Sequence, residues 1–271
     1  MNLTSPSQVK AWCIENGFHP NKVLGQNFLI DQNALKAIVD AGLEGMRNEG
    51  RGMSVLEIGP GLGVLTEEML KRGCRVTAIE KDPVLAARLK ESLGNPEGLT
   101  VVAADALEVL SRPSSLIPHP SFSCMVSNLP YQAGTRILLE LVQRRELPSM
   151  TVLVQTEVAE RLAAGPGTKT RGLAGVWAQL DYDVRIVRKV AASCFWPRPE
   201  IGSSVVRLDR HDRNASLTDE ERKLFRRLTK QAFEHRRKQL GSIFKDLIQS
   251  TARAEELANE DWIQLVKGLI G

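Results

Sequence analysis

The chain has 271 residues, of which 36 are Lys or Arg and 32 are Asp or Glu, so its formal net charge is +4. Hydrophobic residues make up 42% and charged residues 25%, ordinary globular proportions that exclude disordered and fibrous proteins. A chain of this length buries enough surface to be stable without disulfides or metals. The small net charge permits a nucleic-acid partner but does not argue for one.

The four cysteines, at positions 13, 74, 124 and 194, form no CxxC pair. We therefore expect reduced thiols, with neither a disulfide framework nor a metal site. The N-terminus lacks a signal-peptide pattern, and the longest charge-free stretch, 113–135, contains four prolines and cannot form a membrane helix. The sequence predicts a soluble, cytoplasmic protein with no membrane partner.

Helices are expected first at Pro6–Asn16, with Ser5 as its N-cap, and at Asn33–Ala41. Short apolar runs then alternate with helical stretches, and this alternation predicts an α/β fold with a parallel sheet. The expected strands are Met53–Ile58, Val76–Ile79, Leu99–Ala104, Phe122–Ser127 and Met150–Gln155, and the first two crossover helices are Leu62–Lys71 and Pro83–Leu93.

The composition changes after the fifth strand. Residues 191–207 indicate a loop that leads into a late strand at Val205–Leu208, and residues 210–214 form a polar linker. A capping-box-like start at Thr218 then opens a helical region that reaches the C-terminus. We place a domain boundary near residue 210, so residues 1–209, with N-terminal helices in 5–42, form one domain and residues 210–271 a small all-helical one.

The first candidate site is the turn after the first sheet strand, where Gly59 and Gly61 open a helix. Glycines there let a ligand approach the backbone, as in dinucleotide and adenosylmethionine sites. Val64 replaces the third glycine of the dinucleotide pattern, which counts against a nicotinamide or flavin enzyme. A tight turn without a ligand is the alternative.

Two acids end the next two strands. Glu80 follows the second strand and could accept hydrogen bonds from both hydroxyls of a ribose, and Asp105 follows the third and could accept one from an adenine amine. Each has a plain alternative, a solvated strand end for Glu80 and a helix cap for Asp105. A glycine turn and two acids on successive strand ends are less expected by chance than any one of them.

The tetrapeptide Asn128-Leu129-Pro130-Tyr131 ends the fourth strand. An amino group conjugated to a base is a poor nucleophile, and hydrogen bonds to an amide oxygen and a backbone carbonyl free its lone pair. Asn128 supplies the amide, Pro130 stiffens the turn so that the Leu129 carbonyl faces outward, and Tyr131 offers a stacking face. An ordinary Asn-x-Pro turn would not need the aromatic ring.

These motifs together resemble the bacterial small-subunit rRNA adenine dimethyltransferases (the KsgA/RsmA family), which are related to the erythromycin-resistance rRNA methylases. The resemblance covers nearly the whole chain and implies a Rossmann-like class I S-adenosylmethionine-dependent methyltransferase sheet with a small C-terminal helical domain. Its marks are residues 24–29, 55–61, 78–80, 105–107, 128–131, 155–162, 166–169, 195–199 and 233–240.

The resemblance implies roles for individual residues. It implies that S-adenosylmethionine lies along the glycine turn, with Glu80 on its ribose and Asp105 on its adenine amine. It implies that Tyr131 stacks the target adenine, which must leave its stack or loop, and that Phe195 covers the other face. The implied catalytic set is Asn128, Leu129, Pro130, Tyr131 and Phe195, and the implied cofactor set is Gln26, Asn27, Leu29, Gly59, Gly61, Glu80, Lys81, Asp105, Ala106 and Asn128.

The family substrate is a pair of adjacent adenosines in the 3′-terminal hairpin of 16S rRNA, each methylated twice on N6 within an immature small ribosomal subunit. Two other functions stay open, an erythromycin-resistance-type methylase of large-subunit rRNA and a non-catalytic assembly factor. The chain departs from the family pattern at Arg171, Trp196, Glu200 and Gly202, which bears on RNA contacts and not on the cofactor. Nothing in the sequence demands more than a monomer.

The region 222–238 carries eight basic residues against the single acid Glu234, a local charge of +7. Helical spacing would put Arg222, Arg226, Lys230 and Arg237 roughly on one face, suited to phosphate contacts. A solvated basic helix, or a calmodulin- or membrane-binding one, is the alternative. The expected RNA-binding residues are Arg222, Lys223, Arg226, Arg227, Lys230, Arg236, Arg237 and Lys238.

Overall fold

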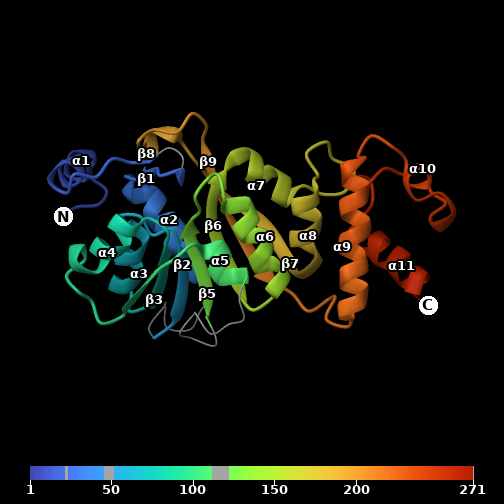
Figure 1. Cartoon of the computed structure of the whole chain (residues 1–271), viewed down its shortest axis with the longest axis horizontal. Coiled ribbons are helices and arrows are strands. Elements are labelled where there is room, and N and C mark those ends of the chain that lie inside the picture. The colour runs from blue at the N-terminus through green and yellow to red at the C-terminus, as the bar shows by residue number, and fades with distance from the viewer. Residues whose placement is uncertain (22–23, 46–51, 112–121, 271) are drawn as a thin grey trace. The chain divides into compact units, whose positions relative to one another are not determined.

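The structure is a computed structural model that describes residues 1–21, 24–45, 52–111 and 122–270 (Figure 1). The described chain groups into two compact units, one of Met1–Ala159 with Arg185–Asp209 and one of Glu160–Val184 with Arg210–Gly271. The main elements in chain order are α1 (Pro6–Glu15), β1 (Phe28–Leu29), α2 (Gln32–Leu43), β2 (Ser54–Ile58), α3 (Val64–Lys71), β3 (Arg75–Glu80), α4 (Pro83–Ser92), β4 (Leu99–Ala103), α5 (Ala106–Ser111), β5 (Cys124–Asn128), α6 (Gly134–Arg144), β6 (Ser149–Gln155), α7 (Thr156–Ala163), α8 (Leu173–Asp181), β7 (Tyr182–Val190), β8 (Phe195–Trp196), β9 (Ser203–Arg210), α9 (Asp219–Glu234), α10 (Leu240–Phe244) and α11 (Asn259–Ile270).

The main sheet has the strand order β4-β3-β2-β5-β6-β9-β7. The five strands from β4 to β6 are parallel, as the alternating pattern predicts, and β9 runs antiparallel to β6. Chain order reverses at β2, which lies between β3 and β5 and is buried along its whole length. Open α/β sheets bind ligands beyond the strand ends at such a reversal.

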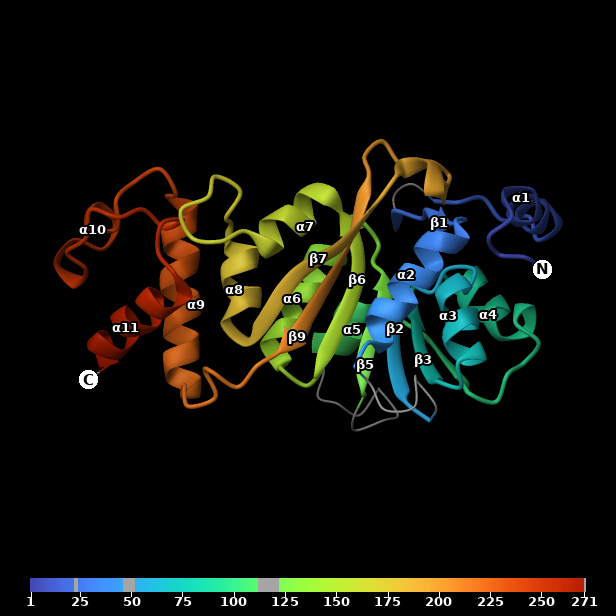
Figure 2. The ribbon, with the colours of Figure 1, turned by 180° about the vertical axis from the view of Figure 1, so that it is seen from behind.

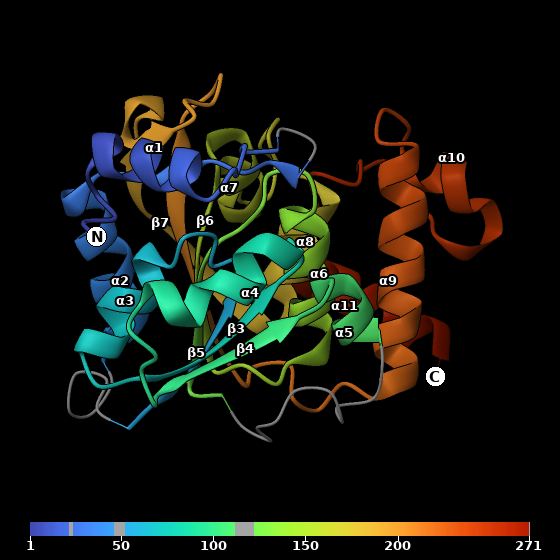
Figure 3. The same cartoon turned by 60° about the vertical axis from the view of Figure 1, so that its left-hand side comes forward.

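Helices cover both faces of this sheet. Figure 1 shows α5 and α6 in front of the central strands, and Figure 2, seen from behind, shows α2 and α3 there. Figure 3 shows α4 beside β3 and β4, the strands with which it packs. The α2/α3 face encloses a core of apolar side chains that includes Ile38, Met69 and Val126.

The sheet and helices differ from the sequence prediction in a few places. Strand β7 was not predicted, because Asp183, Arg185, Arg188 and Lys189 face outward and break its apolar pattern. The expected N-cap Ser5 makes no side-chain capping hydrogen bond, so Pro6 at the first helical position marks the start of α1 instead. The capping box at Thr218 is confirmed, with reciprocal bonds to Glu221.

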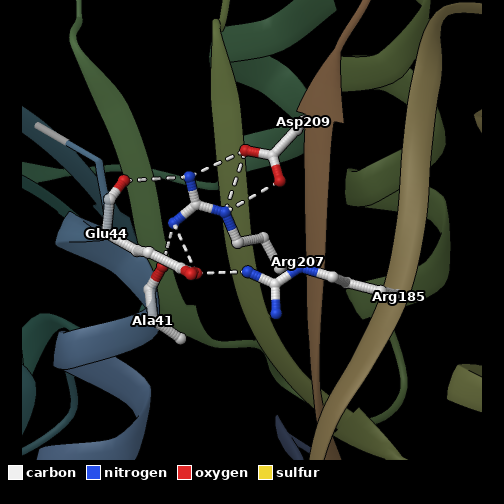
Figure 4. A network of polar contacts seen from close by, with 5 residues as sticks. All are labelled: Ala41, Glu44, Arg185, Arg207 and Asp209. Atoms are coloured by element: carbon white, nitrogen blue, oxygen red, sulfur yellow. Dashed lines mark hydrogen bonds and ion pairs between the residues drawn. The ribbon is translucent and has the colours of Figure 1, made fainter.

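A buried arginine from β9 binds the C-terminal end of α2. Arg207 of β9 donates hydrogen bonds to the carbonyls of Ala41 and Glu44, at the C-terminus of the helix, where backbone carbonyls lack partners within the helix (Figure 4). Asp209 pairs with the same guanidinium at 2.7 Å, and the Glu44 carboxylate binds Arg185 of β7. The positive guanidinium of Arg207 lies at the negative end of the helix dipole. This contact anchors α2 to β9, one of the strands that complete the sheet.

The second unit is helical apart from the start of β7, and its core surrounds Phe225 and Trp262. Arg171 is 1% exposed and donates to the Ala164 carbonyl and to Oδ1 of Asn259, at the start of α11. A buried Arg at this position ties the loop before α8 to the last helix. The predicted division of the chain at residue 210 stays a prediction, and residues 160–184 group with the C-terminal helices in the structure.

Within the described ranges, no helix is long and apolar enough to cross a membrane. The same residues contain no group of three or more His, Cys, Asp or Glu side chains placed to hold a metal ion. All four cysteines are free thiols, and Cys13, Cys74 and Cys124 are buried.

Candidate active site

A cavity of about 200 Å³ opens at the carboxyl ends of β2, β3, β4 and β5, within the first unit. The sequence motifs that end these strands therefore meet at one place, although they are spread along the chain from Gly59 to Tyr131. Every residue of the implied cofactor set lines this cavity, as do Leu129, Pro130 and Tyr131 of the implied catalytic set.

The glycine turn lies directly against the cavity. Gly61 has a φ of +59°, and a Cβ atom there would stand 3.1 Å from Cε1 of Phe28, so only glycine fits without a shift. The backbone N–H of Gly61 donates to Oε2 of Glu80 at 3.1 Å. The turn thus serves both as an open backbone surface and as a donor that holds the acid at the end of β3.

Glu80 is 6% exposed, and its second oxygen, Oε1, accepts from the backbone N–H of Asp82 at 2.8 Å. Burial raises the pKa of Glu80, while the hydrogen bonds from Asp82 and Gly61 act in the opposite direction. The carboxyl is therefore fixed in orientation and keeps lone pairs for further donors.

Asp105 forms an ion pair with Lys81, with Nζ and Oδ2 2.8 Å apart, and its Oδ1 accepts from the N–H of Leu107 at 2.8 Å. The bond to Lys81 holds the pKa of Asp105 below its ordinary value. Asp105 is accordingly both the helix cap that the sequence allowed and an ionised acceptor on the cavity wall.

Glu57, in the middle of β2, is a buried acid that the sequence argument missed. It is 1% exposed and accepts a hydrogen bond from the Thr66 hydroxyl at 2.6 Å. Burial raises the pKa of Glu57 to about 8, against the opposing effect of that bond, and Glu80 adds to the rise. The signal was an acid between two apolar residues, Leu56 and Ile58, inside a strand.

Asn128 and Tyr131 are held by partners far away in the sequence. Nδ2 of Asn128 donates to the Asn27 carbonyl at 3.2 Å, which turns its Oδ1 away from Asn27. The Tyr131 hydroxyl lies 2.7 Å from Oγ of Ser203, at the start of β9. Burial raises the pKa of Tyr131, so its hydroxyl is neutral.

Phe195 is the one implied catalytic residue that does not line the cavity. It pairs with Leu29 in the two-stranded β1–β8 sheet and is 2% exposed within the core. The neighbouring Trp196 stacks on Phe28, with ring centroids 6.4 Å apart. A covering role for Phe195 on a target base therefore stays a prediction.

The basic residues of the second unit do not form the face that helical spacing predicted. Arg222 is 4% exposed and forms an ion pair with the buried Asp181 at 2.8 Å. Assigning it to RNA contacts was therefore wrong, because its guanidinium lies inside the unit. Helix α9 ends at Glu234, which removes Arg237 from that helix. Among the eight basic residues of 222–238, the exposed ones are Lys223, Arg227, Lys230, Arg237 and Lys238, whereas Arg226 and Arg236 are half-buried.

The Arg236 guanidinium also has partners within the second unit. It donates to the Lys169 carbonyl, and its Nε lies 3.5 Å from Oε2 of Glu255. On α9 itself the exposed cations Lys223, Arg227 and Lys230 are spaced by four and three residues and share one face. This face shares Lys230 with the predicted one but has Lys223 and Arg227 in place of Arg222 and Arg226.

The fold of the described chain is similar to that of solved methyltransferases. A dimethyladenosine transferase from Plasmodium falciparum superposes with a TM-score of 0.74 at 22% identity, over 89% of this chain and 97% of that one. The 23S rRNA methyltransferase ErmE gives 0.67 at 24% identity, over 90% and 100%. At these identities the likeness concerns the fold, and it confirms the class I methyltransferase sheet.

Sequence relatives are much more similar. Ribosomal RNA small subunit methyltransferase A of Deinococcus radiodurans is 44% identical over 207 residues, 76% of this chain and 67% of that protein. The protein of the same name from Rhodococcus opacus (strain B4) is 41% identical over 263 residues, 93% of this chain and 85% of that one. The family model for ribosomal RNA adenine dimethylase matches residues 17–266, and the chain therefore belongs to this family.

Proposed function

We propose that this chain transfers methyl groups from S-adenosylmethionine to N6 of two adjacent adenosines in the 3′-terminal hairpin of 16S rRNA, twice on each. The observation that carries the proposal is the meeting of the 128–131 turn with Glu80 and Asp105 at one cavity. Small-subunit rRNA is favoured over large-subunit rRNA because the relatives at 41–44% identity are named for the small subunit.

The cavity fits the cofactor chemically. The missing Cβ at Gly61 leaves room along the turn, and Glu80 presents a fixed, buried carboxyl of the kind that accepts two hydrogen bonds from a ribose. Asp105 is ionised and suits an adenine amine, while Asn27 and Leu29 face the same space. When bound, S-adenosylmethionine supplies a methyl group made electrophilic by its sulfonium sulfur.

The residues of the 128–131 turn would act on the target amine. Oδ1 of Asn128, directed by the bond from its Nδ2 to Asn27, and the Leu129 carbonyl would accept hydrogen bonds from the amine N–H groups. Pro130 keeps that carbonyl in place, and Tyr131 would stack on the base. The protein thus contributes alignment and polar contacts, and a strong general base is unnecessary because methylation makes the remaining proton acidic.

The RNA would be held by the exposed cations of the second unit, Lys223, Arg227 and Lys230 on α9 together with Arg237 and Lys238. Contacts of this kind position phosphates and give affinity that falls with salt, and they carry little sequence information. We propose that the chain acts as a monomer in the cytoplasm on an immature small ribosomal subunit.

Tritium transfer from labelled S-adenosylmethionine to isolated subunits tests the proposal. Label in the small subunit, at two adjacent adenosines, supports it. Label in the large subunit would identify a methylase of the resistance type instead. An absence of label together with tight binding to immature small subunits would favour the assembly-factor function.

A further inference from the structure

Asp82 lies two residues after Glu80, is 8% exposed, and uses both carboxylate oxygens. Its Oδ1 accepts from the N–H groups of Val84 at 2.9 Å and Leu85 at 3.2 Å, which makes it the N-cap of α4. Its Oδ2 accepts from Nε2 of Gln26 at 2.9 Å, a residue 56 positions earlier. One oxygen therefore has a local role, and the other reaches the N-terminal segment.

The backbone of Asp82 adds a third contact. Its N–H donates to Oε1 of Glu80 at 2.8 Å, opposite the bond from Gly61 to the other oxygen. The same residue thus orients the acid that we assign to the ribose and also anchors Gln26. Asp82 is not among the cavity-lining residues, so it acts through its neighbours.

Gln26 cannot turn its amide over without losing a bond. Its Oε1 accepts from the N–H of Asn21 at 2.7 Å, and its own N–H donates to the Asn21 carbonyl at 3.3 Å. Its Nε2 must therefore face Asp82. The next residue, Asn27, presents the carbonyl that accepts from Nδ2 of Asn128. A continuous path of hydrogen bonds and two adjacent residues thus joins Glu80, Asp82, Gln26, Asn27 and Asn128.

We propose that Asp82 is a positioning residue that fixes residues 24–29 on the cavity wall. It links the acid that would hold the cofactor to the amide that would hold the target amine. The consequence is a coupling, because loosening the Gln26 anchor frees the Asn27 carbonyl and with it the orientation of Asn128. This inference rests on the proposed function for the roles of Glu80 and Asn128, and the Asp82 contacts themselves do not depend on it.

The most discriminating test exchanges the amide and the carboxylate between Gln26 and Asp82. Asp82→Asn keeps an oxygen to cap α4, since Asn is a good N-cap, but sets an NH₂ group against Nε2 of Gln26. Gln26→Glu sets a carboxylate against the Asp82 carboxylate. In the double variant the introduced carboxylate accepts from the introduced amide, so the bond between positions 26 and 82 is restored with its direction reversed. The bond from the Asn21 N–H keeps its direction, because a carboxylate oxygen replaces the amide oxygen that accepts it.

Each single variant should weaken S-adenosylmethionine binding in isothermal titration calorimetry by roughly tenfold, and should speed amide hydrogen exchange over residues 24–29. The double variant should recover to within about threefold of wild type in both measurements. Turnover on small subunits should follow the same order. The matched control is Asp31→Asn, which removes the same charge from the N-cap of α2, where Oδ1 accepts from Ala34 at 2.7 Å, and should leave both measurements unchanged.

Wild-type exchange and affinity in the single variants would overturn the proposal, as would a double variant no better than the singles. If Asp82→Asn does not fold, amide exchange over residues 24–29 in Gln26→Glu decides, because Gln26 is half-exposed and caps no helix. Failure of the wild-type protein to methylate any subunit would refute the proposed function instead, and the exchange measurement would still decide the role of Asp82.

Discussion

The Tyr131 hydroxyl and Oγ of Ser203 are 2.7 Å apart, although 72 positions separate them in the chain. This bond joins the turn after β5 to the first residue of β9, where Ser203 is completely buried. Because the edge of the Tyr131 ring is tied to the protein, one ring face can remain fixed toward the cavity. Under the proposed function, the bond would hold a flat surface ready for the target base.

Removing either hydroxyl should therefore slow methyl transfer without affecting the cofactor. For Tyr131→Phe and for Ser203→Ala we expect kcat/KM for the RNA to fall by roughly fivefold to tenfold, the equivalent of one hydrogen bond. The double variant should be no worse than either single one, as a double-mutant cycle of initial rates can show. Additive losses would mean that the two hydroxyls act separately.

Asn128→Ala should abolish methyl transfer and largely spare cofactor binding. The alanine removes the acceptor for the target amine, a loss of at least about a hundredfold in kcat for a polar group that acts at the reacting atom. Single-turnover transfer of labelled methyl groups measures the first effect and calorimetry the second. Robust turnover by this variant would refute the assigned role of Asn128.

Glu80→Ala should act in the opposite way and weaken S-adenosylmethionine binding directly. The substitution deletes a buried acceptor that the N–H groups of Gly61 and Asp82 hold in place, and hydrogen bonds to a charged group contribute about 1.5–3 kcal/mol each. A rise of roughly tenfold or more in the dissociation constant is expected by calorimetry. An unchanged constant would remove Glu80 from the cofactor site.

Arg222 and Lys223 are adjacent in sequence and should behave differently. Arg222→Ala leaves Asp181 buried without its partner and should cost about 3–5 kcal/mol in the free energy of unfolding, measured with urea. Lys223→Ala should leave stability unchanged but lower the salt dependence of RNA binding by about one unit of log–log slope. Equal effects on stability would contradict the inward placement of Arg222.

Glu57 gives a prediction about pH. Its pKa rises from 4.5 in the unfolded chain to about 8 in the folded one, so the unfolded state releases its proton first as pH rises. The stabilisation is complete below about pH 4.5 and is lost as pH rises towards about 8. Glu57→Gln lacks this titration. As pH rises over that range, the difference in unfolding free energy between variant and wild type should therefore shift in favour of the variant.

Urea unfolding of both proteins at about pH 5.5 and about pH 8 measures the difference, and titrations shared by the two proteins cancel. Parallel stability curves would show that Glu57 ionises normally inside β2.

The sequence by itself determined the fold class and the location of the cavity. Gly59, Glu80, Asp105 and Asn128 each follow a predicted strand, and the carboxyl ends of parallel strands meet at one edge of the sheet. Once the alternating pattern was recognised, their proximity followed from the parallel orientation of the strands. The capping box at Thr218 was equally local, since its two partners are three residues apart.

Only the tertiary structure decided which polar side chains bond to each other when they are far apart in the sequence. Gln26 with Asp82, Tyr131 with Ser203, and Arg222 with Asp181 are 56, 72 and 41 positions apart, and no local pattern marks any of these pairs. Helical spacing alone could not say which flank of α9 faces the core, and a one-position rotation put Arg222 inside and Lys223 outside. A periodic pattern gives the spacing of a face, whereas the burial of a charge depends on a partner that packing supplies.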